Sequence, residues 1–219
     1  MLKFHTFVFS PFAENTYVLW DETGQCAIVD PGCYDTSERS KLRTFIEKEG
    51  LTPQLLLNTH CHLDHIFGNQ FVKDTWQIPF CTHEIEIENL KYSELAAKLY
   101  GVNLIPSPQP DQLLVEGDTV KIGNTELEIL FVPGHAAGHI AFFQRAQGLL
   151  FSGDVLFQNS IGRTDLPGGS LEVLMTSIYE KVLPLGDSVQ VMSGHGLVTT
   201  VGQERQANPY ILQFKGQFT

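Results

Sequence analysis

The chain has 219 residues, 42% of them hydrophobic, which is enough for one substantial core. Its 14 Lys and Arg residues against 25 Asp and Glu residues give a formal net charge of −11. A charge of this sign repels polyanions at long range, so we expect no nucleic acid partner. No run of eighteen apolar residues occurs, and the N-terminus lacks a basic segment followed by an apolar one, so we expect no membrane span and no secretory signal.

Composition also bears on domain number and compartment. The length and the absence of a linker-like segment favour one undivided domain over residues 1–219. Four cysteines lack the dense spacing of a disulfide scaffold and are expected to be reduced thiols, as in a cytoplasmic protein: Cys26, Cys33, Cys61 and Cys81.

The first third of the chain predicts a strand meander followed by a helix. Turn residues separate three extended segments, at residues 4–10, 16–21 and 26–29. The third ends at Asp30, which we interpret as a turn-capping carboxylate, with orientation of a ligand loop as the alternative. Asp35 or Ser37 can cap a helix that ends near Gly50. The apolar residues 55–57 then predict a buried strand that leads into a histidine motif.

The remaining elements alternate between helical and extended patterns. Helices are predicted at residues 66–76 and 84–100, with a short strand at 80–82 between them and a proline-rich loop at 101–112. Strands follow at residues 119–122, 126–131, 140–144, 148–151 and 189–192. Ser170 begins a helix before the last strand, with an apolar face formed by Leu171, Leu174, Met175, Ile178 and Val182.

Four of the predicted strands end at side chains that bind metals. Their seven members are His60, His62, Asp64, His65, His135, Asp154 and His195. One structural zinc needs only four ligands, so the set favours two ions that share a bridging carboxylate. We expect two divalent cations, zinc first, with iron or manganese as alternatives.

The spacing of the histidine motif divides it between two ions. His60 and His62 form one pair, and Asp64 with His65 forms the other. His135 would complete the first ligand set and His195 the second, while Asp154 would bridge with one oxygen to each ion. We predict Asp64 and Asp154 to be catalytic as well as metal-binding residues.

Other polar residues are assigned to lesser roles. Lone histidines are usually packed or exposed residues, so His5 and His83 are placed outside the site, and His139 is expected to orient a ligand or to pack. Arg163 lies in a loop that follows Asp154. It is predicted to contact an anionic group of the substrate, the alternative being an ion pair with Asp165.

Four motifs carry a resemblance to a known family. Thr-His-Cys-His-Leu-Asp-His, Pro-Gly-His-Ala-Ala-Gly-His, Phe-Ser-Gly-Asp and Ser-Gly-His-Gly occur in this order. Together they resemble the metallo-β-lactamase superfamily, and the chain is most similar to short bacterial glyoxalase II-like hydrolases. The resemblance implies an α/β (α+β) fold, the four-layer αββα sandwich with metals at one edge. It also implies the same ligand sets: His60, His62 and His135 for one zinc, Asp64, His65 and His195 for the other, and Asp154 between them.

Two features depart from the family pattern. Ala136 stands where the family commonly has a threonine, which removes a hydroxyl beside a ligand. Only residues 202–219 are left for the separate C-terminal helical domain with which typical glyoxalase II grips glutathione, so we expect no such domain. Recognition of glutathione is therefore left open.

These observations predict hydrolysis of a small thioester, such as S-lactoylglutathione, by a metal-bridging hydroxide. A thiolate with a pKa of about 8.5 can leave without a dedicated general acid. The alternatives are a persulfide dioxygenase with one iron on a 60/62 histidine, His135 and Asp154; a lactonase or other small-ester hydrolase; and an inert metal-stabilised binding module. A small molecule is the expected partner, and the oligomeric state is left open.

Overall fold

The computed structural model describes residues 1–217 and divides the chain into two compact units. The first unit comprises Met1–Leu114 with Val120–Glu126, and the second comprises Val115–Thr119 with the residues from Leu127 onward. The undivided domain expected from the sequence stays a prediction.

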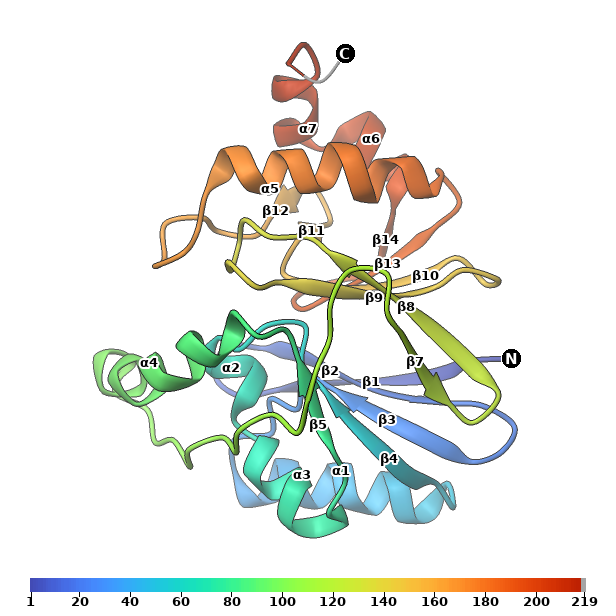
Figure 1. Cartoon of the computed structure of the whole chain (residues 1–219), viewed down its shortest axis with the longest axis vertical. Coiled ribbons are helices and arrows are strands. Elements are labelled where there is room, and N and C mark those ends of the chain that lie inside the picture. Colours follow the sequence, from blue (N-terminus) through green and yellow to red (C-terminus); the bar gives the residue numbers. More distant parts are fainter. Residues whose placement is uncertain (218–219) are drawn as a thin grey trace. The chain divides into compact units, whose positions relative to one another are not determined.

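The first unit is built on a six-stranded mixed sheet (Figure 1). Its antiparallel strands are β1 (Lys3–Phe9), β2 (Glu14–Trp20) and β3 (Gln25–Val29). Parallel pairing then continues through β4 (Thr52–Leu57), β5 (Phe80–Thr82) and β6 (Gln112–Leu113). The helices of this unit are α1 (Thr36–Lys48), α2 (Leu63–Ile66), α3 (Asn69–Trp76) and α4 (Glu86–Tyr100).

Local sequence explains how this sheet delivers its loops. Asp35 caps α1 by accepting from the Glu38 amide, and the buried Leu42 and Ile46 form the inner face of the helix. The parallel register pairs Val29 with Leu57. Because parallel strands end at the same sheet edge, the loop after β3 and the histidine motif after β4 emerge together.

The second sheet runs in the order β14-β13-β10-β9-β8-β7. Its strands are β7 (Thr119–Ile122), β8 (Thr125–Phe131), β9 (Ile140–Gln144), β10 (Leu149–Gly153), β13 (Gln190–Ser193) and β14 (Thr199–Thr200). A small hairpin joins β11 (Leu156–Phe157) to β12 (Ser160–Ile161). The helices are α5 (Leu171–Ser177), α6 (Val201–Ala207) and α7 (Pro209–Phe214).

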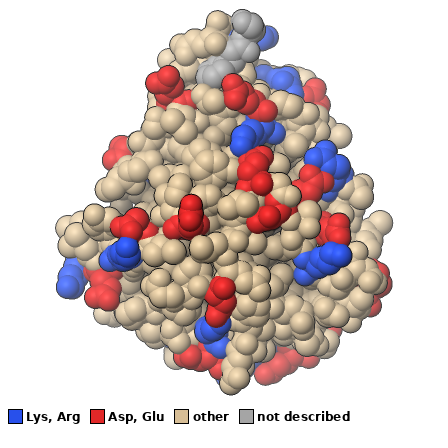
Figure 2. Space-filling model, in the orientation of Figure 1, with Lys and Arg blue, Asp and Glu red and all other residues tan. Residues whose placement is uncertain are grey.

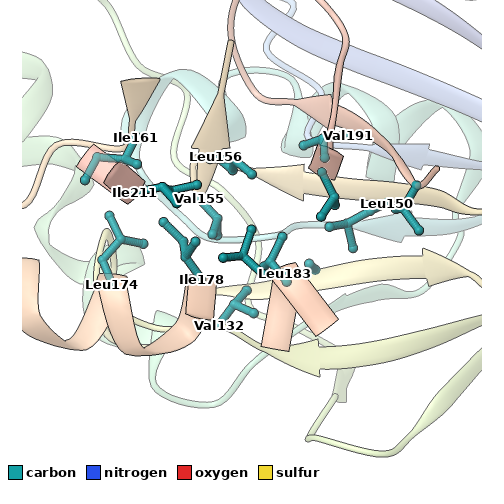
Figure 3. Close-up of a cluster of buried hydrophobic side chains, with 14 of the residues drawn as sticks. Val132, Leu150, Val155, Leu156, Ile161, Leu174, Ile178, Leu183, Val191 and Ile211 are labelled. Atoms are coloured by element: carbon teal, nitrogen blue, oxygen red, sulfur yellow. The ribbon is translucent and has the colours of Figure 1, made fainter. Parts of the chain in front are cut away.

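The core of the second unit confirms most of the predicted apolar face after Ser170. Figure 3 shows Leu174 and Ile178 among the side chains of this core, which also includes Val132 and Leu150 from the sheet. Leu171 departs from the prediction, because it is 37% exposed. The helix also changes form, since α5 continues as a π-helical turn at Ile178–Val182 and a 3-10 turn at Leu183–Leu185.

The helix predicted at residues 66–76 is interrupted, and the reason is a close backbone approach. Gly68 donates its amide hydrogen to the carbonyl of Pro31 at 2.7 Å. A Cβ atom at Gly68 would meet Cys33 Sγ at 2.4 Å, so this contact needs glycine. The chain therefore forms α2, turns at Gly68 and starts again as α3.

Several elements were not predicted at all. They are the short strands β6, β11, β12 and β14 and the helices α6 and α7. Strands of two residues are too short to show an alternating pattern, and the pairing that creates them is non-local. Their positions are set by tertiary contacts.

Two surface properties bear on the predicted partners. Within residues 1–217, no helix has the length and apolar character needed to cross a membrane. On the face drawn in Figure 2, basic side chains lie singly among acidic ones. The exclusion of nucleic acid and the cytoplasmic location stay predictions.

Candidate metal centre

The first unit brings together four of the seven predicted ligands, on the loop after β4 and in the first turn of α2. The rings of His60 and His62 have centroids 4.7 Å apart, and those of His60 and His65 are 4.1 Å apart. Asp64 Oδ2 lies 3.9 Å from His65 Nε2. His60 and His65 are fully buried, so these donors are held against one another rather than dispersed in solvent.

Asp30 holds this loop in place. Its carboxylate accepts hydrogen bonds from Asn58 Nδ2 at 3.1 Å, from the Thr59 amide at 2.8 Å and from the Thr59 hydroxyl at 2.7 Å. The turn-capping role that we favoured for Asp30 is therefore wrong, and orientation of the ligand loop is the role observed. The residue adopts a left-handed backbone with φ of 47°, which turns its side chain away from its own turn.

Asp30 also determines which nitrogen of each buried ring faces a metal. His65 Nδ1 lies 3.2 Å from Asp30 Oδ2 and donates its hydrogen there. The Thr59 hydroxyl gives its own hydrogen to Asp30, so it accepts from His60 Nδ1 at 3.0 Å. Both rings thus carry their hydrogen on Nδ1 and present the Nε2 lone pair, which is the usual arrangement of a metal-binding histidine.

Asp30 lies near enough to these rings to be considered a ligand itself. One of its oxygens is within 4.8 Å of the donor atoms of His60 and His65. Both of its oxygens already accept hydrogen bonds from Asn58, Thr59 or His65. We therefore assign it the orienting role.

Two further carboxylates of this unit were missed by the sequence reasoning. Glu14 is fully buried with Oε1 3.9 Å from His65 Nδ1, and burial raises the pKa of its carboxyl well above the usual value. Glu86 is also buried, and it accepts from the Cys61 amide at 2.7 Å within the histidine motif. An acidic residue in the otherwise apolar β2 was the signal for Glu14, whereas nothing in the sequence marked Glu86.

The second unit brings together the other three ligands. His135 follows β8, Asp154 follows β10 and His195 follows β13. The parallel register of β10 and β13 pairs Gly153 with Ser193, which places Asp154 and His195 at the same sheet edge. Asp154 Oδ2 is 3.5 Å from His135 Nε2 and 3.6 Å from His195 Nε2.

These two distances fit a shared metal ligand. Two ligand atoms on one tetrahedral zinc lie roughly 3.3–3.6 Å apart when the bonds are about 2.0–2.2 Å long. The same oxygen, Oδ2 of Asp154, faces both His135 and His195. This arrangement favours a single shared oxygen, whereas the sequence reasoning assigned one oxygen to each ion.

Neighbouring groups orient the ligands of the second unit. His135 Nδ1 donates to the backbone carbonyl of Arg163 at 2.7 Å, which leaves Nε2 turned toward Asp154. His139 is fully buried, and its Nε2 accepts from the Asp154 amide at 3.1 Å. The orienting role expected for His139 is therefore confirmed.

The side chain of Arg163 forms the ion pair that was the alternative to substrate binding. Its Nε and Nη2 atoms each donate to Asp165 at 2.7 Å. These hydrogen bonds hold the pKa of the Asp165 carboxyl down at about 2. Contact between Arg163 and a substrate stays a prediction.

His195 is the most accessible ligand of this unit, with 27% of its side chain exposed. The ring of Phe157 meets it edge-on, with centroids 6.2 Å apart. Ser193 anchors this neighbourhood by donating to the carbonyl of Leu156 at 2.7 Å. The β11–β12 hairpin is therefore fixed beside the loop that carries His195.

The residues placed outside the site lie elsewhere in the first unit. His5 stacks on Phe45 with centroids 4.3 Å apart. His83 accepts from the Ile85 amide at 3.3 Å, and burial lowers the pKa of its ring. Both occupy local packing or capping positions, as expected.

The cysteines do not supply a nucleophile. All four are free and buried. Burial raises the pKa of Cys26, Cys33 and Cys81 to about 12 and raises that of Cys61 further in the same direction. A thiol with such a pKa is protonated at neutral pH, so thiolate chemistry at these positions is excluded.

The donor chemistry fits divalent metal ions. Each unit buries imidazole and carboxylate groups side by side, an arrangement that is costly without a compensating cation. The Nδ1 atoms of His60, His65 and His135 are engaged by oxygen acceptors, so each ring offers Nε2. Nitrogen and carboxylate donors suit zinc, iron and manganese.

A comparison with known families now decides the class of protein. The model of the metallo-beta-lactamase superfamily matches residues 10–195. The chain belongs to this superfamily. The predicted fold class is thereby confirmed, and the superfamily's combination of sheets flanked by helices with His and Asp metal-binding groups identifies a metallo-hydrolase.

Relatives within the metallo-beta-lactamase superfamily match nearly the whole chain. A probable metallo-hydrolase of Bacillus subtilis, YqgX, is 40% identical over 216 residues, which cover 97% of this chain and 99% of the relative. The hydroxyacylglutathione hydrolase GloC of Haemophilus influenzae is 37% identical over 203 residues, covering 91% of this chain and 93% of GloC. The resemblance to glyoxalase II-like proteins seen in the motifs is confirmed by this second relative.

Solved structures of superfamily members give the same result. The B3 metallo-beta-lactamase BLEG-1 superposes with a TM-score of 0.84 at 37% identity, over 95% of this chain and 99% of BLEG-1. TTHA1623 in a di-iron-bound form superposes with a TM-score of 0.85 at 33% identity, over 94% of this chain and 99% of TTHA1623. A member of this size can therefore bind two metal ions.

Proposed function

We propose that this protein is a dinuclear metal-dependent hydrolase of a small thioester, a hydroxyacylglutathione such as S-lactoylglutathione. The observation that carries the proposal is the complete donor set in a chain that matches GloC over 93% of GloC's length. GloC is named a hydroxyacylglutathione hydrolase. Its length leaves little room for an added C-terminal domain, so the lack of such a domain no longer argues against a glutathione thioester.

We further propose that both units contribute ligands to the same two ions. One ion takes three imidazoles, the other takes two imidazoles and a carboxylate, and a further carboxylate is shared: His60, His62 and His135; Asp64, His65 and His195; and Asp154. When bound, the pair of ions would polarise the thioester carbonyl and lower the pKa of a coordinated water to roughly 7. Zinc is our first choice, with iron or manganese as alternatives.

The protein's own residues prepare this chemistry. Asp30 and the Arg163 carbonyl fix the ring hydrogens of His65 and His135 on Nδ1, so the Nε2 donors are set before any ion binds. His139 holds the Asp154 backbone and so fixes the shared carboxylate. A thiolate leaving group has a pKa of about 8.5 and needs no proton from the protein.

Arg163 stays our candidate for contact with a substrate carboxylate. Glutathione carries two such groups, and a guanidinium binds each carboxylate oxygen through a separate N–H. In the structure Asp165 occupies that fork with two bonds of 2.7 Å. Substrate binding would therefore require exchange of one carboxylate for another.

A second candidate activity is hydrolysis of a β-lactam. BLEG-1, named a B3 metallo-beta-lactamase, is 37% identical to this chain over nearly its full length. The reaction also attacks a carbonyl, but it expels an amine, a poorer leaving group than a thiolate. We therefore place it second.

Elemental analysis combined with substrate tests would decide among these proposals. We would measure metal content of the purified protein and its turnover of S-lactoylglutathione, nitrocefin and an aliphatic lactone. About two metal ions per chain with preferential thioester hydrolysis is the expected result. His5→Ala is a matched control, because His5 stacks on Phe45 and should leave metal content unchanged.

The other outcomes are equally informative. One iron per chain, no hydrolysis and oxygen uptake with glutathione persulfide would replace the proposal with a dioxygenase. Preference for nitrocefin or for the lactone would change the substrate class. Two bound ions with no turnover of any substrate would favour an inert binding module.

A further inference from the structure

A buried carboxylate on α6 connects the two loops that follow metal ligands in the second unit. Glu204 is fully buried. Its Oε2 accepts from the Asn159 amide at 2.8 Å, and its Oε1 accepts from the Thr199 hydroxyl. Asn159 lies in the segment after Asp154, and Thr199 lies in the segment after His195.

The tip of the β11–β12 hairpin depends on this contact. Asn159 adopts a left-handed backbone with φ of 58°, which a side-chain-bearing residue rarely takes. Each strand of the hairpin has two residues, so its own ladder is short. Hydrogen bonds from outside the hairpin are therefore needed to hold the tip.

Asn208 reinforces the same attachment. Its Nδ2 donates both to Glu204 Oε2 and to the carbonyl of Ser160, each at 2.9 Å. Its Oδ1 accepts from the Tyr210 amide at 3.1 Å and caps α7. The segment of α6 and α7 thus holds the hairpin on both sides of its tip.

The hairpin in turn contacts a metal ligand. Phe157 lies two residues before Asn159, and its ring meets the His195 ring edge-on at 6.2 Å between centroids. His195 has no carbonyl or carboxylate partner on Nδ1 among the printed contacts of Asp30 and Arg163 type, and its Nε2 lies 3.6 Å from Asp154 Oδ2. An aromatic wall restricts rotation of the imidazole in such a position.

We propose that Glu204 is a positioning residue, which holds Phe157 against His195 through the hairpin and so fixes the imidazole for the second metal ion. This inference rests on the proposed metal centre. It assigns the short helices α6 and α7 a role in that centre, in addition to their packing in the core.

The test is a titration of the metal-free protein with Co²⁺, followed through the absorption of the bound ion. Glu204→Gln keeps the size of the side chain but replaces one acceptor by an amide. We expect the second equivalent of Co²⁺ to bind about tenfold more weakly with an altered spectrum, as for other residues that support a ligand. Binding of the first equivalent should be unchanged.

Two further variants separate positioning from general stability. Phe157→Leu should weaken the second equivalent similarly, and the double variant should be no weaker than either single variant, because both act on His195. Glu172→Gln, on the exposed first turn of α5, is the matched control. Thr199→Val removes one of the bonds to Glu204 and replaces Glu204→Gln if that variant does not fold.

The outcomes distinguish this inference from the proposed function. Unchanged affinity for the second equivalent in a folded Glu204→Gln variant, or additive effects with Phe157→Leu, would overturn the positioning role alone. A wild-type protein that binds fewer than two Co²⁺ ions would overturn the dinuclear centre itself.

Discussion

Asp30 Oδ2 lies 3.2 Å from His65 Nδ1, although 35 positions separate the two residues in the chain. The parallel pairing of β3 with β4 creates this proximity, because both strands end at one sheet edge. The contact converts a carboxylate at a turn into a group that fixes a ring hydrogen. The ligand loop is thus organised by a residue that binds no metal itself.

Replacement of Asp30 should therefore weaken metal binding without removing a ligand. In Asp30→Asn, the amide would present N–H groups toward His65 Nδ1 and Thr59, which disfavours the required ring hydrogens. We expect metal affinity to fall by about 10–100-fold, measured by competition with a chelator. Asp35→Asn is the control, because asparagine also caps a helix. Equal metal affinity in the two variants would contradict the orienting role.

Asp154 is expected to matter more, because we assign it to both ions. Asp154→Ala removes the oxygen that faces His135 and His195 at 3.5 and 3.6 Å. We expect metal content to drop below two ions per chain and thioester turnover to be abolished. Elemental analysis and a thioester assay on the same preparation would show this. A variant that kept both properties would disprove the shared-ligand role.

The motifs predicted the ligands well because each sits where a strand ends, and strand ends are marked by local sequence. The contacts that organise those ligands were harder to predict. Asp30 reaches His65 through strand pairing, and Glu86 reaches Cys61 from a different helix. Such contacts depend on tertiary placement, which spacing alone does not encode. The same holds for the β11–β12 hairpin, whose strands are too short for a pattern.

The ion pair of Arg163 with Asp165 gives a prediction about substrate affinity. Asp165→Asn should free the guanidinium, so KM for a glutathione thioester should fall if Arg163 binds a substrate carboxylate. Arg163→Lys should raise KM, because lysine cannot form the two-bond fork. Since the pKa of Asp165 is about 2, the effect of Asp165→Asn should not vary between pH 6 and 9. Steady-state kinetics of both variants would test this, and unchanged KM values would remove Arg163 from the site.

Gly134 precedes the ligand His135 and tolerates no side chain. Its φ is 129°, and a Cβ atom there would lie 2.2 Å from the backbone nitrogen of Leu174. We expect Gly134→Ala to lower the free energy of unfolding by about 1–3 kcal/mol or more. Gly148→Ala is the control for positive φ alone, since its nearest neighbour would be 3.7 Å away. Urea unfolding should show the larger loss for Gly134→Ala, and equal losses would refute the crowding argument.

Glu14 gives a pH-dependent prediction for the metal-free protein. Burial raises the pKa of its carboxyl in the folded state well above the model value of 4.5, and the nearby Asp30 raises it further, against a smaller opposing effect of His65. The folded protein therefore holds this proton more tightly than the unfolded chain does. Its contribution to stability is complete below pH 4.5 and is lost as the pH rises toward the folded pKa.

Glu14→Gln removes this loss, because glutamine stays neutral at every pH. The variant should therefore gain stability relative to the wild type as the pH is raised from 4.5 to 8, measured by urea unfolding in the presence of a chelator. Glu38→Gln, at the exposed first turn of α1, controls for loss of an ordinary carboxylate. A stability difference that stayed constant over this range would show that Glu14 is ionised in the folded protein at all these pH values.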